Sequence, residues 1–175
     1  ERRRGLADRP TPCAPEAITP MSRAVPNFPL LSVPAEWDDL TLLAAMVFLE
    51  AEGEPEDGQL GVGWVARNRS DRWRQLLTSV ILAPMQFSCF NQEYFSTMGQ
   101  ARLTTAEERA DSCWKAAASA LWRLSPDPTF GADHYLNVEA TKTARKKHDL
   151  PAWFDTAKVT VVIGRHTFLR LDDAR

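Results

Sequence analysis

MVFLEAEGEPEDGQLGVGWVARNR, residues 46–69, places a group of acids directly after an apolar run that is typical of a buried helix. From Leu40 onwards the apolar residues recur at helical spacing, and Glu50 is the next member of the same stripe. EGEPEDG then ends the helix, because glycine and proline interrupt helical periodicity. We therefore predict a helix that has Asp38 or Asp39 as its N-cap and carries Glu50 on its core-facing side.

Most of the remaining chain also has the pattern of helices. We expect a second helix over residues 59–70 and a short third one that ends before Pro84, followed by an aromatic loop over 84–99. Another helix begins with a capping box of Thr105 and Glu108 and runs to Leu124, with Cys113 on its core side. Two glycines inside the second helix each cost about 1 kcal/mol relative to alanine, so we expect close packing there.

The C-terminal segment KVTVVIGRHTFLRL, residues 158–171, contains two β-rich runs joined by Gly164 and Arg165, which is typical of a hairpin. The predicted fold class is therefore α+β, a mainly helical domain with a small C-terminal antiparallel β-hairpin, over residues 37–175. Residues 1–36 hold seven of the 12 prolines and show no periodicity, so we predict a disordered leader. Translation from Met21 would remove much of it.

Composition excludes several classes of partner. A net charge of -2 offers no general attraction to nucleic acid, and no apolar run approaches the roughly 20 residues that span a bilayer. The three cysteines are odd in number and lack metal-ligand spacing, which indicates reduced thiols. We expect a monomer without metal or cofactor, made in the cytoplasm without a visible signal peptide.

An acid on the core side of a helix has a specific chemical use. Because desolvation disfavours the charged form, a carboxyl held against apolar side chains stays protonated near neutrality, as a general acid requires. The alternative is that Glu50 lies at the frayed helix end, facing water or paired with Arg67 or Arg69. Helical spacing alone leaves both interpretations open.

Five segments, in order, resemble the catalytic domain of the SleB-type cell wall hydrolases, a family that includes spore cortex-lytic enzymes and phage endolysins. They are FLEAEGEPEDGQLGVGWVARNR, PMQFSCF, PDPTFGADHYLN, PAWF and VTVVIGRHTFLR. The resemblance covers about Leu40 to Arg170 and implies a lysozyme-like fold and a muramidase that cleaves peptidoglycan glycan strands. It makes Glu50 the catalytic acid, as the first glutamate of the family's E-A-x-G-E motif, and Glu54 the second glutamate.

The loops around these motifs supply the polar and aromatic groups that a glycan cleft needs. The candidate substrate-binding residues are Glu54, Asn68, Gln86, Phe87, Ser88, Tyr135, Asn137 and Trp153. The alternatives are a surface or capping carboxylate at Glu54, an aromatic loop packed on the core, and a core position for Trp153. His166 fits a structural hydrogen-bonding role better than a catalytic one.

Three residues depart from the family pattern. Leu49 stands where many members have glycine, and Leu136 stands where a second tyrosine is expected. Glu52 stands where arginine is common and adds a negative charge near Glu50.

The resemblance implies a lytic transglycosylase, in which the C6 hydroxyl of N-acetylmuramic acid attacks the anomeric carbon and one glutamate serves as acid and base. A conventional hydrolysing muramidase would need a second carboxylate, such as Glu54 or Asp57, to activate water. A zinc hydrolase using His134, His148 and His166 lacks ligand spacing in the sequence. A non-catalytic peptidoglycan-binding module is the other alternative.

The expected place of action is the cell wall, which the protein would reach as a phage lysin or as a truncated secreted enzyme.

Overall fold

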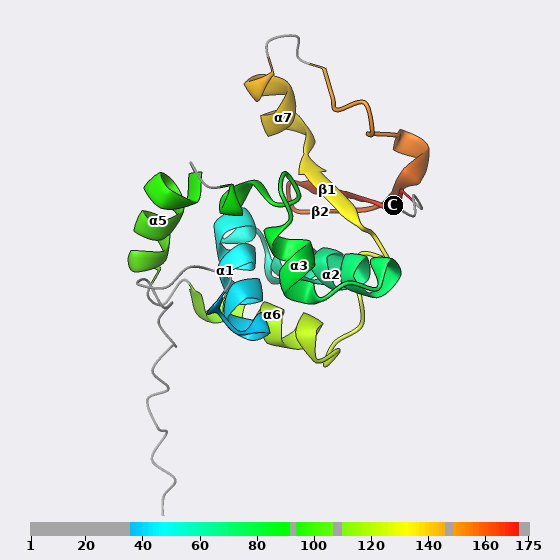
Figure 1. The fold of residues 1–175 in the computed structure, drawn as a ribbon. Coiled ribbons are helices and arrows are strands. Elements are labelled where there is room, and N and C mark those ends of the chain that lie inside the picture. Colours follow the sequence, from blue (N-terminus) through cyan, green and yellow to red (C-terminus); the bar gives the residue numbers. More distant parts are fainter. Residues whose placement is uncertain (1–35, 92–93, 107–109, 146–148, 172–175) are drawn as a thin grey trace, which may run out of the picture.

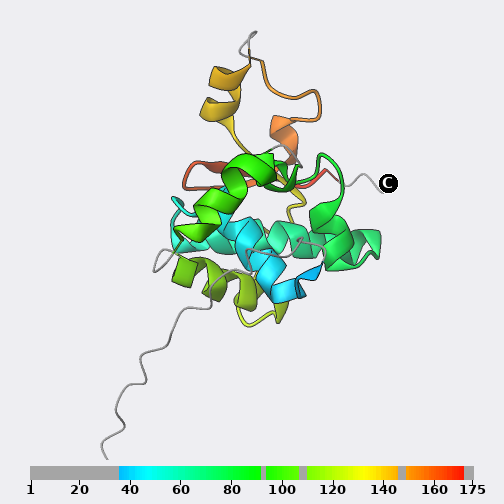
Figure 2. The ribbon, with the colours of Figure 1, turned by 60° about the vertical axis from the view of Figure 1, so that its left-hand side comes forward.

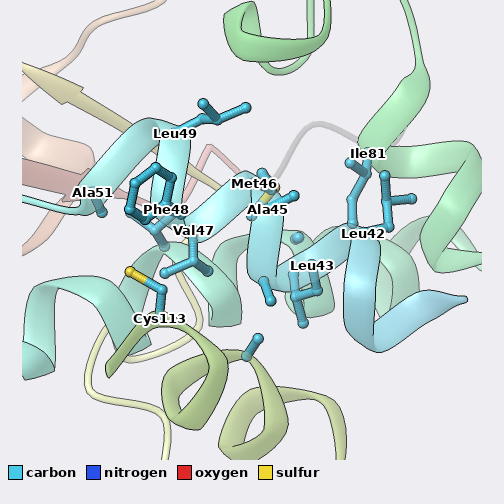
Figure 3. Packing of buried hydrophobic residues seen from close by; sticks show 14 of the residues in the cluster. Leu42, Leu43, Ala45, Met46, Val47, Phe48, Leu49, Ala51, Ile81 and Cys113 are labelled. Atoms are coloured by element: carbon cyan, nitrogen blue, oxygen red, sulfur yellow. The ribbon is translucent and has the colours of Figure 1, made fainter. Parts of the chain in front are cut away.

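The central helix α1 (Asp39–Ala51) is buried on every side over most of its length. All residues from Leu42 to Leu49 are at most 6% exposed, and they pack mainly against α6 and α2. Figure 3 shows these side chains meeting Ile81 and Cys113, which confirms the predicted core position of Cys113. Of the two predicted N-cap residues, Asp38 takes this position, and its carboxylate accepts the backbone N–H of Thr41 at 2.9 Å.

The structure is a computed structural model that describes residues 36–91, 94–106, 110–145 and 149–171. Apart from Glu36, the leader proposed for residues 1–36 lies outside the described residues, as does the Glu108 half of the capping box. Among the described residues, none of the helices combines the length and the apolar character needed to cross a membrane. The elements after α1 are α2 (Glu56–Trp73), α3 (Leu77–Leu82), η2 (Ser88–Phe90), η3 (Phe95–Gly99), α5 (Gln100–Thr104), α6 (Ala110–Leu121), β1 (His134–Asn137), α7 (Val138–Ala144), η5 (Thr156–Lys158), β2 (Val159–Ile163) and β3 (His166–Leu169).

Several predicted boundaries were wrong. Helix α2 begins three residues before the predicted start, because Pro55 serves as its N-cap and the acids Glu56 and Asp57 suit the positive end of the helix dipole. The segment predicted as a loop over 84–99 contains all of η2 and η3, and α5 follows η3 directly. Helix α6 ends at Leu121, so Leu124, predicted on its apolar stripe, is 69% exposed.

The glycines of α2 are sites of close packing, as predicted. A Cβ at Gly61 would lie 2.8 Å from the Phe168 ring and 3.0 Å from the Thr129 methyl group. A Cβ at Gly63 would lie 3.1 Å from the Cβ of Ala120 on α6. Because glycine has no side chain, α2 packs closely against the sheet at Gly61 and against α6 at Gly63.

A three-stranded antiparallel sheet in the order β1-β3-β2 lies against the helices. The predicted hairpin is confirmed as β2 and β3, whereas β1 was missed because its four residues, HYLN, show no strand pattern of their own. Figures 1 and 2 show the sheet between the helical layer and α7. The register pairs Tyr135 with Phe168 and Asn137 with His166, so these four side chains share one face.

Gly61→Ala tests the contact between α2 and the sheet. The added methyl group would meet Phe168 and should destabilise the fold by about 1 to 3 kcal/mol, although alanine favours helix formation. Urea unfolding of the wild type, of Gly61→Ala, of Phe168→Leu and of the double variant measures the coupling. The alanine should cost less in the Phe168→Leu background, and an equal cost in both backgrounds would contradict the close contact.

Candidate active site

Glu50 lies in the last turn of α1, where this buried helix reaches the surface. Its side chain is partly exposed, so the predicted core-facing placement was wrong: burial ends at Leu49 and resumes only at Ala51. The η2 segment supplies two donors to Oε1, the Ser88 hydroxyl at 3.3 Å and the Cys89 backbone N–H at 3.1 Å. These contacts fix the orientation of the carboxyl group toward η2.

The face of the sheet that carries Tyr135 borders Glu50 from the other side. Burial raises the pKa of Tyr135 well above its ordinary value, and the neighbouring Glu50, as a charge and as a hydrogen-bond acceptor, raises it further. The Tyr135 ring meets the His166 ring edge-on at 5.0 Å between centroids. Burial lowers the pKa of His166, although the charges of Glu54 and Glu50 oppose the shift, so this imidazole is neutral at pH 7.

Glu54 holds the turn between β2 and β3 against the end of α1. Only 3% of its side chain is exposed, and its two oxygens accept the Arg165 backbone N–H at 2.8 Å and the Arg165 Nε–H at 2.7 Å. Gly164 is required in this turn, because its φ is +58° and a Cβ there would overlap Glu54. Burial alone would raise the pKa of Glu54, but the hydrogen bonds from Arg165 bring it below its ordinary value.

Gln59 supports the connection between α1 and α2 that carries Glu54. Its amide nitrogen donates to the Glu54 carbonyl at 3.1 Å, and its Oε1 accepts the Cys113 thiol at 3.6 Å. Gln59 is 4% exposed, and these contacts give its buried side-chain amide hydrogen-bond partners. Sequence reasoning missed both Gln59 and Arg165; the polar residue inside the apolar face of α2 was the available signal.

Arg69 links two segments that flank Glu50. Its Nε–H donates to the Asp133 carbonyl, and its Nη1 donates to the carbonyl and side-chain oxygens of Gln86 at 3.5 and 3.3 Å. The guanidinium also lies over the Phe87 ring, 4.8 Å from its centroid. The structure thus gives Arg69 other partners than Glu50, and Arg67 pairs with Asp71 at 3.5 Å.

The predicted substrate-binding residues separate into two groups. Ser88 and Tyr135 meet at Glu50, while Gln86, Tyr135 and Trp153 line an adjacent cavity. The others serve the scaffold in this structure: Phe87 is 3% exposed, Asn68 donates to Asp127 and to the Ala132 carbonyl, Asn137 caps α7, and Glu54 binds Arg165.

The remaining acids and histidines lie apart from Glu50 or have partners of their own. Glu52 forms an ion pair with Arg102 at 2.9 Å, and Asp57 lines a groove between α2 and α6. His134 and His166 lie on opposite faces of the sheet by register, and His148 is outside the described residues. Within the described part of the chain, no three His, Cys, Asp or Glu side chains form a metal-binding group.

Two departures from the family pattern also have structural explanations. Leu136 points to the face opposite Tyr135 and packs with Leu169 and Leu171 in a small second cluster. Leu49 is 6% exposed and belongs to the main core, so it packs beside the acid without entering its hydrogen bonds.

Comparison with known proteins defines the class to which this fold and site belong. The family model described as Cell Wall Hydrolase matches residues 53–169, more than half of the chain, and the chain therefore belongs to that family. Glu50 lies just before the matched segment. A search of curated proteins found no match.

Two solved structures are similar to this chain over most of its length. The catalytic domain of the Bacillus cereus SleB protein is 25% identical, with 75% of this chain and 89% of that chain covered and a TM-score of 0.55. The catalytic domain of the germination-specific lytic transglycosylase SleB from Bacillus anthracis is 24% identical, with 79% and 100% covered and a TM-score of 0.54. The predicted family and the mainly helical fold class are thus confirmed.

The pairing of Glu54 with Arg165 predicts a pH dependence of stability. A carboxylate whose pKa is lowered by folding stabilises the fold above its unfolded value, about 4.5, and loses this contribution as the pH falls through the folded pKa. Glu54→Gln should cost about 1 to 3 kcal/mol at pH 7, and the difference from wild type should shrink between about pH 5 and pH 3. Urea unfolding across this range, with exposed Glu139→Gln as the control, measures it; a constant difference would contradict the pairing.

Proposed function

We propose that this cell wall hydrolase is a lytic transglycosylase that cleaves the β-1,4 bond between N-acetylmuramic acid and N-acetylglucosamine in peptidoglycan. The proposal rests on the different availability of Glu50 and Glu54 for proton transfer. Glu50 is partly exposed and oriented by two donors, whereas Glu54 is buried with both oxygens bound to Arg165. One available acid suits a reaction in which the substrate supplies its own nucleophile.

Glu50 acts twice in this mechanism. It first donates its proton to the departing glycosidic oxygen, so the bond from the anomeric carbon to that oxygen breaks. The C6 hydroxyl of the same muramic acid then attacks the anomeric carbon, and its proton passes to Glu50. The product is a 1,6-anhydro ring, Glu50 regains its proton, and no water is consumed. The intramolecular attack has the advantage of proximity.

The surroundings of Glu50 suit these two proton transfers. Ser88 and the Cys89 amide stabilise the carboxylate that remains after the first transfer, and both are held on the short η2 segment. Tyr135 lies beside Glu50 with a pKa well above its ordinary value, so its hydroxyl stays a donor at neutral pH. His166 is neutral behind it and adds no competing positive charge.

A hydrolysing muramidase is the competing mechanism, and it requires a second carboxylate to activate water. Glu54 would have to release Arg165, which loses two hydrogen bonds and the ion pair that hold the turn between β2 and β3. Asp57 lines the groove between α2 and α6 with Ser112 and Lys115, away from Ser88 and Tyr135. Neither acid is therefore suited to work opposite Glu50.

Glu50→Gln tests the proposed acid. The amide is nearly isosteric and cannot donate the required proton, so the rate of peptidoglycan lysis should fall by about 10²- to 10⁴-fold. Melting temperature and binding to insoluble peptidoglycan should stay close to wild type. Glu139→Gln, an exposed change on α7, is the matched control and should keep full activity. Near wild-type lysis by Glu50→Gln would remove Glu50 from the mechanism.

Product chemistry separates the transglycosylase from the hydrolase and from a binding module. Digestion in ¹⁸O-labelled water should give muropeptides with 1,6-anhydro ends, lighter by one water than reducing ends and free of label. Mass spectrometry of the soluble products measures both features. Reducing, ¹⁸O-labelled ends would establish hydrolysis, and binding without soluble fragments would indicate a non-catalytic module.

A further inference from the structure

The C-terminal end of α1 is held by an arginine from another helix. Arg102 lies on α5, and its Nη1 donates to the Leu49 carbonyl at 2.9 Å. Leu49 directly precedes Glu50 in the chain. Carbonyl groups in the last turn of a helix lack partners within that helix, and α1 has no basic residue of its own in this turn. Arg102 therefore caps α1 from outside, next to the acid.

The other contacts of Arg102 fix the position of its guanidinium. Nη2 donates to Glu52 Oε1 at 2.9 Å, and Nη1 also donates to the Tyr94 hydroxyl at 2.8 Å. The guanidinium lies over the Phe48 ring, 5.9 Å from its centroid. Because this group is planar and its donors have a fixed geometry, partners on two sides hold it in one orientation.

The helix that carries Arg102 is packed to the segment that supplies the Glu50 donors. Helix α5 follows η3 directly, and the Phe95 ring of η3 packs against the Phe90 ring of η2 at 5.4 Å between centroids. Burial and the charge of Glu50 raise the pKa of the Cys89 thiol, whereas the charge of Arg102 opposes the shift. Arg102 thus lies near the residue whose backbone N–H donates to Glu50.

Arg102 also offsets a negative charge beside the acid. Glu52 follows Glu50 by two residues and is one of the departures from the family pattern. A carboxylate without a partner at this place would disfavour the charged form of a neighbouring carboxyl group. The ion pair of Glu52 with Arg102, in which the side chains are 26% and 29% exposed, reduces this effect.

We propose that Arg102 is a positioning residue for the cleavage reaction. Its hydrogen bond to the Leu49 carbonyl fixes the last turn of α1, and so sets the direction of the Glu50 carboxyl group toward its donors on η2. The proposal rests on the glycan-cleaving function proposed above. Arg102 acts through Glu50 and not on the sugar, so its loss lowers the rate of proton transfer and leaves substrate affinity in place.

Steady-state kinetics with soluble, peptide-free glycan strands test this role, at a temperature well below the melting temperature of each variant. Arg102→Met keeps a long apolar side chain but loses the charge and the donors, so kcat should fall about 10-fold while KM stays within about twofold of wild type. Arg102→Lys keeps a cationic donor without the planar fork, and its kcat should lie about 3-fold below wild type.

Arg123→Met is the matched control. Arg123 forms an ion pair of the same kind with Asp71 of α2 at 2.6 Å, and neither residue contacts Glu50 or its donors. This variant should keep the kcat and KM of wild type. An unchanged kcat of Arg102→Met, a rise in KM in place of the fall in kcat, or an equal fall in kcat in Arg123→Met would each overturn the proposal.

Two further outcomes are decided in advance. If Arg102→Met does not fold, Arg102→Lys replaces it, and a kcat equal to wild type or an altered KM overturns the proposal. Failure of the proposed reaction is seen separately. Reducing, ¹⁸O-labelled products would exclude the transglycosylase, but a hydrolase with Glu50 as its acid would still need Arg102. An inactive Glu50→Gln protein beside a fully active Arg102→Met protein would remove the role of Arg102 alone.

Discussion

Burial of α1 on all sides is the constraint on which the rest of the structure depends. A carboxylate inside this helix would have no water and no partner, so an acid can only stand where the helix reaches the surface. Glu50 occupies that place, one residue before the end of α1. The remaining elements must therefore come to the acid: η2 approaches with the Ser88 and Cys89 donors, and the sheet approaches with Tyr135.

The contact between Glu54 and Arg165 brings the sheet to the acid, and it also limits the chemistry. Both oxygens of Glu54 accept hydrogen bonds from the turn that leads into His166 and β3. Since β3 pairs with β1, this turn also sets the position of Tyr135. The contact with Arg165 thus uses both oxygens of the second glutamate of the motif, which supports the proposed mechanism with one acid.

Local patterns in the sequence were sufficient to predict α1, the region of its N-cap and the β2–β3 hairpin, because each of these depends on residues close in the chain. Strand β1 could not be predicted, since its pairing partner β3 lies about 30 residues further on. The ordered motifs identified the family, and Ser88 and Tyr135 do meet Glu50. Asn68 and Phe87 have the right chemistry for a cleft, but their long-range contacts use them in the scaffold, and no local pattern reveals such contacts.

Arg69 shows how far the site depends on such long-range contacts. Its guanidinium joins Gln86, at the start of the segment that supplies the Glu50 donors, to Asp133, at the start of β1. These two segments are therefore connected through one buried side chain of α2, which also lines the adjoining cavity. Because the guanidinium is planar and its donors have a fixed geometry, the connection sets a defined spacing between the two segments. Arg69 thus both lines the adjoining cavity and holds Gln86, two residues before the Ser88 that donates to Glu50.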